Sequence, residues 1–259
     1  AQKLGISLIL IAGGEPFSRE DLLDILHDFP HIIFPIFTNG LLLNDAKISK
    51  LSRMQHVIPL VSIEGFDENT DCRRGKNVFA SAMEVFAKMR AEKKFFGASI
   101  TATRENFAEI TAECFIRELI DKGAGLFVFV EYAPIDEKTQ HLVLLPEQRD
   151  ELLHLEKRFH KDFNKLAVVF PGDEEKYGGC MAAGRGFFHV SAEGYIEPCP
   201  FAPFSQHRLP QISLMEALSS EFFATIRANH DKLTENGGGC ALWNNREWVK
   251  SVLSTLPKT

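Results

Sequence analysis

Short apolar runs alternate with amphipathic stretches from the start of the chain to about residue 163, and this alternation limits the possible folds. The runs typical of strands lie at residues 6–11, 32–37, 57–63, 95–103 and 126–131. Helical periodicity is found over residues 18–29, from residue 44, and over residues 77–92, 106–122 and 146–163. Strands that alternate with helices in this way pair in parallel through crossover connections. The sequence therefore predicts an α/β fold, either an open doubly wound sheet or a full or partial barrel.

Polar residues follow the expected strands at their carboxyl ends, where both of these folds place their functional groups. They are Glu15, Asn39, Ser62 with Glu64, Thr101 with Thr103, and Glu131. We expect these side chains to meet at one rim of the sheet. For the last three of them, a strand-end cap or a solvated side chain is the alternative.

The composition argues against several classes of protein. A chain of 259 residues that is 45% hydrophobic can bury a substantial core. Its net charge of −6 argues against a nucleic-acid partner, because such domains usually carry a basic face. No apolar run approaches the roughly 18 residues of a membrane-spanning helix, and no signal peptide is recognisable. Five cysteines are too few for a disulfide scaffold at this length, so we expect a cytoplasmic setting. Because no run is long and apolar enough to span a membrane, we expect no membrane partner.

Glycines and cysteines become frequent after about residue 168, which predicts a second, smaller module over residues 169–259. A hairpin is expected over residues 187–198, turning near Gly194, and helices over residues 214–229 and 245–253. The hairpin would bring Cys180 and Cys199 to one centre, and the glycines at 237–239 would let the backbone at Cys240 approach a bulky group.

Thiolates at Cys180, Cys199 and Cys240 would suit an iron–sulfur cluster or zinc. The alternative is three buried free thiols. The spacing is not that of an ordinary zinc ribbon, and the identity of a fourth ligand stays open. Cys72, in a charged loop, and Cys114, in a helix, have no comparable setting, and we expect no site there.

The segment Ala12–Pro16 follows the first expected strand directly. Gly13 and Gly14 would let a ligand approach the main chain closely, and Glu15 can accept hydrogen bonds from an ammonium group. A plain tight turn is the alternative. Arg73 and Arg74 are expected in a polar loop, as a solvated charge run or as a contact to an anionic substrate or a cofactor carboxylate.

Taken together, these features make the chain resemble radical S-adenosylmethionine enzymes with a C-terminal auxiliary-cluster module of the SPASM or twitch type. Residues 12–16 match that family's motif for the methionine amino group. Residues 38–40 and 61–65 match the ends of the next two strands, with Glu64 where the family usually has Asp. Cys180, Gly194 and Cys199 match the module's Cys-x(9–15)-Gly-x4-Cys signature.

The resemblance implies a partial (β/α)6-type, TIM-like barrel over residues 1–168 and an auxiliary-cluster module over residues 169–259. Gly13, Gly14 and Glu15 would hold the methionine end of S-adenosylmethionine. Ser62 and Glu64 would reach its ribose. The side chains implied to face cofactor or substrate are those of Thr101, Thr103 and Glu131. The module would hold an auxiliary iron–sulfur cluster on Cys180, Cys199 and Cys240.

In the family, a catalytic 4Fe-4S cluster and S-adenosylmethionine together yield a 5′-deoxyadenosyl radical that abstracts hydrogen from the substrate. The resemblance thus also implies an electron donor such as ferredoxin or flavodoxin, and a peptide or protein substrate. The family holds the catalytic cluster on a Cys-x3-Cys-x2-Cys motif, which these residues lack. That motif lies one strand–helix unit before Gly-Gly-Glu-Pro, so we expect a truncated or partly observed chain that lacks its first barrel unit. A degenerate, non-radical relative is the alternative.

For residues 1–259 alone we expect weak binding of S-adenosylmethionine or none, and no reductive cleavage. Two other functions stay open. One is a barrel enzyme that uses Glu15, Glu64 and Glu131 as acid–base groups without a cluster. The other is a scaffold with a structural metal in the C-terminal module and no catalytic activity.

Overall fold

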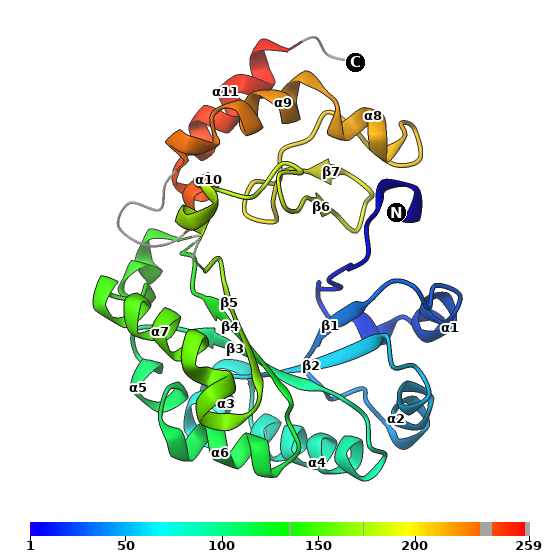
Figure 1. The fold of residues 1–259 in the computed structure, drawn as a ribbon, viewed down its shortest axis with the longest axis vertical. Coiled ribbons are helices and arrows are strands. Elements are labelled where there is room, and N and C mark those ends of the chain that lie inside the picture. Colours follow the sequence, from blue (N-terminus) through cyan, green and yellow to red (C-terminus); the bar gives the residue numbers. More distant parts are fainter. Residues whose placement is uncertain (135, 173, 234–239, 257–259) are drawn as a thin grey trace. The chain divides into compact units, whose positions relative to one another are not determined.

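The computed structural model describes residues 1–134, 136–172, 174–233 and 240–256 and divides into two compact units (Figure 1). The first unit is Ala1–Tyr132 with Asp136–Phe170, and the second is Ala133–Ile135 with Pro171–Thr259. Each unit has its own cluster of buried apolar side chains.

A parallel five-stranded sheet forms the centre of the first unit, with strands in the order in which they follow along the chain. The strands are β1 (Phe34–Thr38), β2 (Val57–Ile63), β3 (Gly97–Ala102), β4 (Leu126–Glu131) and β5 (Leu166–Phe170). The predicted α/β fold with crossover helices is therefore confirmed. β5 was not predicted, because the run lies across the expected domain boundary at residue 168.

Helices connect the strands of this sheet. The α-helices are α1 (Leu22–His27), α2 (Asp45–Ser52), α3 (Asp67–Arg74), α4 (Val78–Ala91), α5 (Phe107–Ile110), α6 (Glu113–Asp121) and α7 (Pro146–Phe163). Short 3-10 helices lie at Gln2–Leu4, Pro16–Ser18 and Glu137–Leu142. Helices α1, α2, α4, α6 and α7 run along the outer side of the curved sheet in Figure 1, and their apolar faces pack on it.

The segment before β1 differs from the buried strand expected at residues 6–11. It pairs in parallel with β1 and the residue before it only through two isolated bridges, Leu8 with Ile33 and Ile11 with Ile36. Leu8 and Leu10 are about half exposed, at 49% and 46%. Ile9 and Ile11 pack against the core on the other side. One face of this run is thus exposed and the other packs on the core. Among the described residues, no strand pairs with its outer edge.

Helix α3 forms where a polar loop was expected. Almost no apolar residue marks it, and Thr70 is its one buried residue among those that the structure describes. Its charges explain the helix, since acidic Asp67 and Glu68 occupy the first turn and basic Arg73 and Arg74 the last. This order complements the helix dipole. Hydrophobic periodicity could not reveal such a helix.

Two expected helices of the first unit are interrupted or shortened. The stretch predicted over residues 106–122 breaks at Thr111 and Ala112 into α5 and α6. The stretch predicted over residues 18–29 is helical only at Leu22–His27. The predicted start of α2 is confirmed, because the Asn44 side chain accepts a hydrogen bond from the Lys47 amide at 2.9 Å and caps the helix.

The second unit contains the expected hairpin, made of β6 (His189–Val190) and β7 (Ile196–Glu197), which pair antiparallel. Its helices are α8 (Leu214–Leu218), α9 (Glu221–Ala228), α10 (Ala241–Asn244) and α11 (Arg246–Thr255), with 3-10 turns at Glu174–Tyr177 and His230–Lys232. The helix predicted over residues 214–229 is two helices, because Ser220 caps a new one. The glycines at 237–239 lie outside the described residues.

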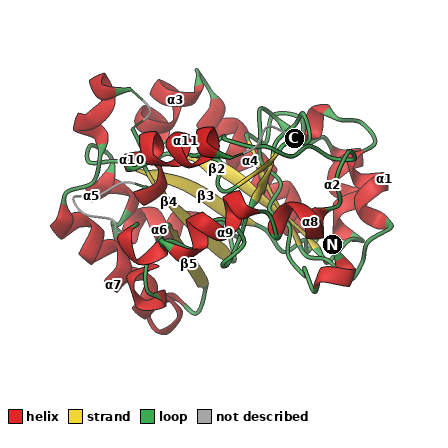
Figure 2. Cartoon of the chain, turned by 90° about the horizontal axis from the view of Figure 1, so that it is seen from above, coloured by secondary structure: helices red, strands yellow, loops and turns green. Residues whose placement is uncertain are grey.

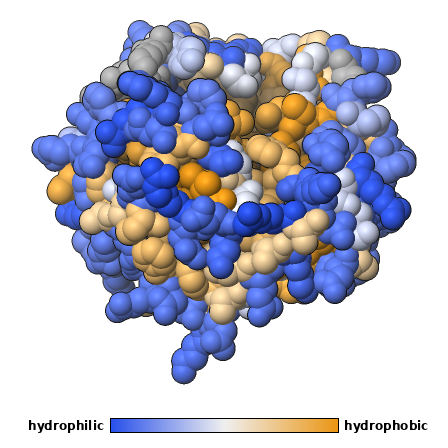
Figure 3. Space-filling model, turned by 60° about the horizontal axis from the view of Figure 1, so that its bottom comes forward, coloured by the Kyte–Doolittle hydropathy of each residue, from blue (hydrophilic) through white to orange (hydrophobic). Residues whose placement is uncertain are grey.

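Helices of the described part are all too short or too polar to cross a membrane. Figure 2 draws the same elements from above, with helices in red and strands in yellow. On the face drawn in Figure 3, hydrophilic residues surround smaller apolar areas.

Candidate functional site

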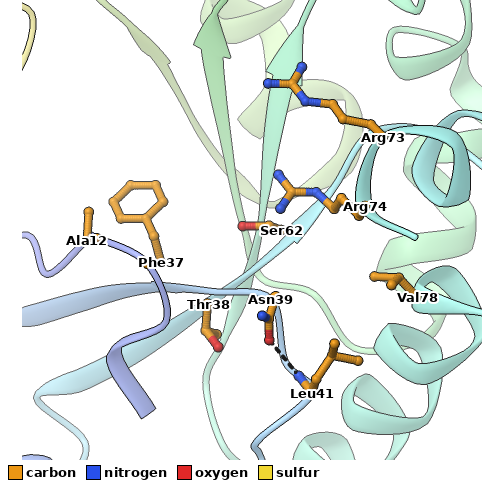
Figure 4. A pocket seen from close by; sticks show the side chains of 11 residues that line it. Ala12, Phe37, Thr38, Asn39, Leu41, Ser62, Arg73, Arg74 and Val78 are labelled. Atoms are coloured by element: carbon orange, nitrogen blue, oxygen red, sulfur yellow. Dashed lines mark hydrogen bonds between the residues drawn. The ribbon is translucent and has the colours of Figure 1, made fainter. Parts of the chain in front are cut away.

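A pocket of about 310 Å³ opens in the first unit at the carboxyl ends of β1 and β2 (Figure 4). This volume is at the lower end of the range for small-molecule sites. It is lined by Ala12, Gly13, Gly14, Phe37, Thr38, Asn39, Leu41, Ser62, Arg73, Arg74 and Val78. Three of the predicted site residues, Gly13, Gly14 and Ser62, are therefore brought together.

Gly13 and Gly14 present bare backbone to open space. A Cβ atom built on either glycine meets nothing within 4 Å. Gly13 also has a φ of +131°, a conformation that other residues rarely adopt. The turn therefore leaves room that a side chain would fill, and it fits a ligand that lies against the main chain.

The Glu15 carboxylate is hydrogen-bonded to other residues of the protein. Its carboxylate accepts hydrogen bonds from the Phe17 amide at 3.0 Å and from the Thr38 hydroxyl at 2.8 Å. Its other oxygen accepts from the Asn39 amide at 2.8 Å. Glu15 thus ties the Gly13–Gly14 turn to the end of β1, so that both sides of the pocket are held together. The predicted contact with an ammonium group stays a prediction.

Glu64 lies behind the pocket and is almost fully buried, with a side-chain exposure of 2%. Its Oε1 accepts a hydrogen bond from Arg74 and a long one, 3.4 Å, from the Thr101 hydroxyl. Its Oε2 lies 3.7 Å from Arg73 Nη1 but has no hydrogen-bond partner within the described structure. A buried carboxylate needs such pairing to offset its lost hydration.

The remaining strand-end residues do not line the pocket. Thr103 bonds through its amide and hydroxyl to Asn106 Oδ1, at 2.8 and 2.9 Å. The Asn106 amide group donates in turn to the carbonyl oxygens of Glu64 and Thr101, both at 2.9 Å. Glu131 accepts a hydrogen bond from Arg149 at 3.0 Å. Contacts of Thr101, Thr103 and Glu131 with a ligand stay predictions.

Sequence reasoning missed several pocket residues. Phe37 and Val78 read only as apolar positions of a strand and a helix, and Leu41 as an apolar residue between the two elements. Arg73 and Arg74 were noticed but expected in a loop, and the acidic-to-basic order of residues 67–74 was the signal that could have placed them on a helix.

Three cysteines gather in the second unit. Cys180 and Cys199 are buried and Cys240 is partly buried. Burial raises the pKa of the Cys180 thiol to about 12. The Cys199 thiol donates a hydrogen bond to the Cys240 sulfur, which raises the pKa of Cys199 and lowers that of Cys240. Cys72 and Cys114 are exposed, Cys72 on α3 and Cys114 on α6.

Backbone contacts explain why Cys180 and Cys199 lie close together. The Ala183 amide donates to the carbonyl oxygen of Pro198, the residue before Cys199, at 3.0 Å. Arg185 Nη1 donates to the carbonyl oxygens of Gly179 and Cys180 at 2.8 and 2.9 Å. These bonds fix the loop of Cys180 against the end of the hairpin.

The donor set is three soft sulfur ligands, which fits an iron–sulfur cluster. Within the described ranges, no three His, Cys, Asp or Glu side chains are arranged to share a single metal ion. A cluster differs from a single ion in that each thiolate binds its own iron. The assignment of these cysteines as cluster ligands stays a prediction.

No family model matches the chain. A search of curated proteins finds the sporulation killing factor maturation protein SkfB of Bacillus subtilis, which is 24% identical over 169 residues. The match covers 63% of this chain and 41% of SkfB. The chain is thus homologous to a maturation protein of which it matches less than half.

Solved structures share the fold. Streptococcus suis SuiB superposes with a TM-score of 0.69 at 15% identity, over 85% of this chain and 57% of SuiB. It has been crystallised bound to S-adenosylmethionine and to its precursor peptide SuiA. The enzyme anSMEcpe, with bound S-adenosylmethionine and a peptide, superposes with a TM-score of 0.64 at 14% identity, over 97% of this chain and 86% of that one.

These likenesses confirm the predicted resemblance to radical S-adenosylmethionine enzymes with SPASM-type modules. They also confirm the partial-barrel fold class. The chain spans less than two thirds of SkfB and of SuiB.

Proposed function

We propose that this chain is the cofactor-binding body of a radical S-adenosylmethionine enzyme that modifies a peptide or protein. The observation that carries the proposal is the Gly13–Gly14 turn, whose backbone faces open space at the strand ends and which Glu15 joins to β1. The fold supports it, since SuiB and anSMEcpe hold S-adenosylmethionine on the same fold. A maturation protein as homologue and the bound peptides of those structures support the substrate class.

The chain's own residues would bind and orient the cofactor. The main chain at Gly13 and Gly14 would hold the methionine end, and Ser62 with Glu64 would reach the ribose. Thr101 and Glu131 would line the way to the substrate. With a 4Fe-4S cluster, bound S-adenosylmethionine supplies the 5′-deoxyadenosyl radical that abstracts hydrogen. The protein's part is to position the reactants and exclude water.

In the second unit, Cys180, Cys199 and Cys240 would hold the auxiliary iron–sulfur cluster. Their burial and the hydrogen bond between Cys199 and Cys240 support a shared site. We further propose a cytoplasmic setting and an electron donor of the ferredoxin or flavodoxin class, because both clusters require reduction and a reducing environment.

Binding of S-adenosylmethionine to residues 1–259 tests the proposal. Since we expect weak binding without the catalytic cluster, saturation-transfer NMR of the ligand is the suitable measurement. The wild type should give a signal, and Gly14→Leu should abolish it by filling the open space in front of the turn. Ala91→Leu, at the exposed end of α4, is the matched control and should bind as the wild type does. An unchanged signal in Gly14→Leu would contradict the proposal.

Catalysis gives a second readout. With dithionite and reconstituted iron and sulfide, residues 1–259 should form no 5′-deoxyadenosine, because none of their cysteines forms a Cys-x3-Cys-x2-Cys motif. Formation of 5′-deoxyadenosine by these residues would contradict the assignment of the catalytic cluster to other residues.

The structure disfavours acid–base catalysis by Glu15, Glu64 and Glu131 as the main alternative. Glu64 and Glu131 are buried against arginines, and Glu15 accepts three hydrogen bonds. None of these carboxylates lines the pocket. A chain that binds iron but gives no S-adenosylmethionine signal would instead indicate a metal-binding scaffold.

A further inference from the structure

The three thiols of the second unit leave one ligand position of an iron–sulfur cluster to another side chain. Two-iron and four-iron clusters are both commonly held by four protein ligands. Cys180, Cys199 and Cys240 account for three, whereas Cys72 and Cys114 belong to helices of the first unit. Ligands other than cysteine do occur, as the imidazoles of Rieske centres show. A fourth ligand from the second unit must therefore be a side chain of another type.

The chain just before Cys180 folds back on itself. Gly178 and Gly179 have φ angles of +76° and +101°, which residues with a side chain rarely adopt. A Cβ atom on Gly179 would also lie only 2.4 Å from the His230 carbonyl oxygen. The Gly179 amide donates to the Glu174 carbonyl oxygen at 3.1 Å and closes the turn. This turn brings Glu174, which begins a short 3-10 helix, back toward Cys180.

Arg185 holds the turn in place. Its guanidinium group donates to the carbonyl oxygens of Tyr177, Gly179 and Cys180, the last two at 2.8 and 2.9 Å. The Cys180 amide donates in turn to the Leu233 carbonyl oxygen at 3.3 Å. The backbone on the amino-terminal side of the first thiol is thus fixed by hydrogen bonds within the second unit.

The carboxylate of Glu174 lies among the thiols. It is half-buried and accepts a hydrogen bond from the Cys180 thiol, and Cys199 and Cys240 form a second hydrogen-bonded pair. Glu174 also interacts electrostatically with Cys240, and Cys180 does so with both other thiols. The two pairs are therefore close enough to surround one polynuclear group.

We propose that Glu174 is the fourth protein ligand of the auxiliary iron–sulfur cluster, at the position that the three thiolates leave to another donor. This inference rests on the proposed auxiliary cluster. Thiols bind iron as thiolates, so on cluster binding the Cys180 proton passes to solvent and the carboxylate that accepted it is available to iron. A carboxylate oxygen is a harder donor than a thiolate, so the iron that it binds differs from iron held by sulfur alone.

His230 is the competing candidate for the fourth ligand. Its Nδ1 donates to the Arg227 carbonyl oxygen at 2.7 Å, which leaves Nε2 with its lone pair. Nε2 lies 3.7 Å from the position that a Cβ atom on Gly178 would take. The imidazole thus faces the turn, whereas the Glu174 carboxylate is bonded to the Cys180 thiol itself. The experiment includes both residues.

Hyperfine spectroscopy of the reduced cluster tests the proposal. Residues 1–259 are produced with glutamate carrying carbon-13 in its side-chain carboxyl group, reconstituted anaerobically with iron and sulfide, and reduced with dithionite. Glu174→Gln keeps the shape without the charge, Glu174→Cys supplies a fourth thiolate, and His230→Asn removes the imidazole. Glu221→Gln, exposed at the start of α9 in the same unit, is the matched control. Circular dichroism establishes that each variant is folded.

The wild type, His230→Asn and Glu221→Gln should show coupling between the unpaired electron and a carboxyl carbon-13 nucleus. Glu174→Gln and Glu174→Cys should lose this coupling. Glu174→Cys should keep the iron content of the wild type because it restores four ligands, whereas Glu174→Gln should bind less iron. Where Glu174→Gln does not fold, Glu174→Cys decides the question.

The proposal is overturned if the wild-type cluster shows no carboxyl coupling, or if the coupling persists in Glu174→Cys. A nitrogen coupling in the wild type that disappears in His230→Asn would assign the position to the imidazole and overturn it as well. A wild type that binds no iron at all would refute the proposed auxiliary cluster, and this ligand with it. A wild type that holds a cluster without the carboxyl coupling refutes only the assignment of Glu174.

Discussion

A side chain that the sequence places at a ligand site can instead form hydrogen bonds within the protein. Glu15 follows two glycines at a strand end, so its carboxylate reads as an acceptor for a cofactor ammonium group. In the folded chain that carboxylate joins Thr38 and Asn39 to the turn. The sequence predicted Glu15 at the site, but its hydrogen bonds connect residues more than twenty positions apart, which periodicity and spacing do not reveal.

Lys94 has a pH-dependent effect on stability. It is buried, with 3% exposure, and its ammonium group donates to the Met54 carbonyl oxygen at 2.7 Å. Burial lowers the pKa of Lys94 from 10.5 to about 8. Between these values the unfolded chain binds more protons than the native one, so the free energy of unfolding rises with pH. Below about pH 8 both states are protonated and the cost of burying the charge is complete.

Lys94→Met should remove this dependence. The free energy of unfolding of the wild type, relative to the variant, should rise by about 1 to 2 kcal/mol between pH 7.5 and 9.5. Urea denaturation of both proteins at the two pH values measures it. Lys93→Met, at the exposed residue just before Lys94, is the matched control and should behave as the wild type does. A constant difference between wild type and Lys94→Met would contradict the assignment.

At the scale of elements, the sequence predicts those helices and strands whose apolar residues are buried in the core. β4 and α7 begin and end as expected, because their apolar patterns are long and their cores are buried. Helix α3 was missed because charge order and a single buried threonine stabilise it, and neither produces an apolar period. The sequence predicted the pocket only in part. Its glycines and strand-end polar residues were expected at the site, whereas the position of the arginines depends on helix α3, which was missed.

Thr70 connects α3 to the strand that precedes it. Its hydroxyl donates to the Gly65 carbonyl oxygen at 2.8 Å and accepts from the Glu64 amide at 3.0 Å, with no exposure. Thr70→Val keeps the shape but leaves both backbone groups without this partner. We expect a loss of about 1 to 3 kcal/mol in the free energy of unfolding, measured by urea denaturation.

The same substitution should loosen the position of Arg73, which lies one turn further along α3. Thr70→Ser, which keeps the hydroxyl, should retain the stability of the wild type. If Thr70→Val were as stable as the wild type, the connection between strand and helix would not depend on this hydroxyl.

At the scale of the whole molecule, the two units have separate apolar cores and separate chemistry. The first presents backbone and arginines at strand ends, and the second presents buried thiols. Glycine turns and cysteine spacing are visible in the sequence, so local patterns predicted the Gly13–Gly14 turn and the candidate thiols, but not the helix that carries the arginines. The end of the first unit at Phe170 depends on β5, whose pairing with β4 is a tertiary contact.

The five cysteines of the chain provide an internally controlled test of the metal site. After anaerobic reconstitution with iron and sulfide, Cys180→Ala/Cys199→Ala should lose bound iron and the visible absorption of a cluster. Cys72→Ala/Cys114→Ala removes two exposed thiols outside the buried group and should keep both. Because the thiols lie in a different core from the pocket, the first double variant should still bind S-adenosylmethionine as the wild type does. Equal iron content in the two double variants would mean that these thiols hold no cluster, and iron lost together with S-adenosylmethionine binding would mean that the two sites depend on each other.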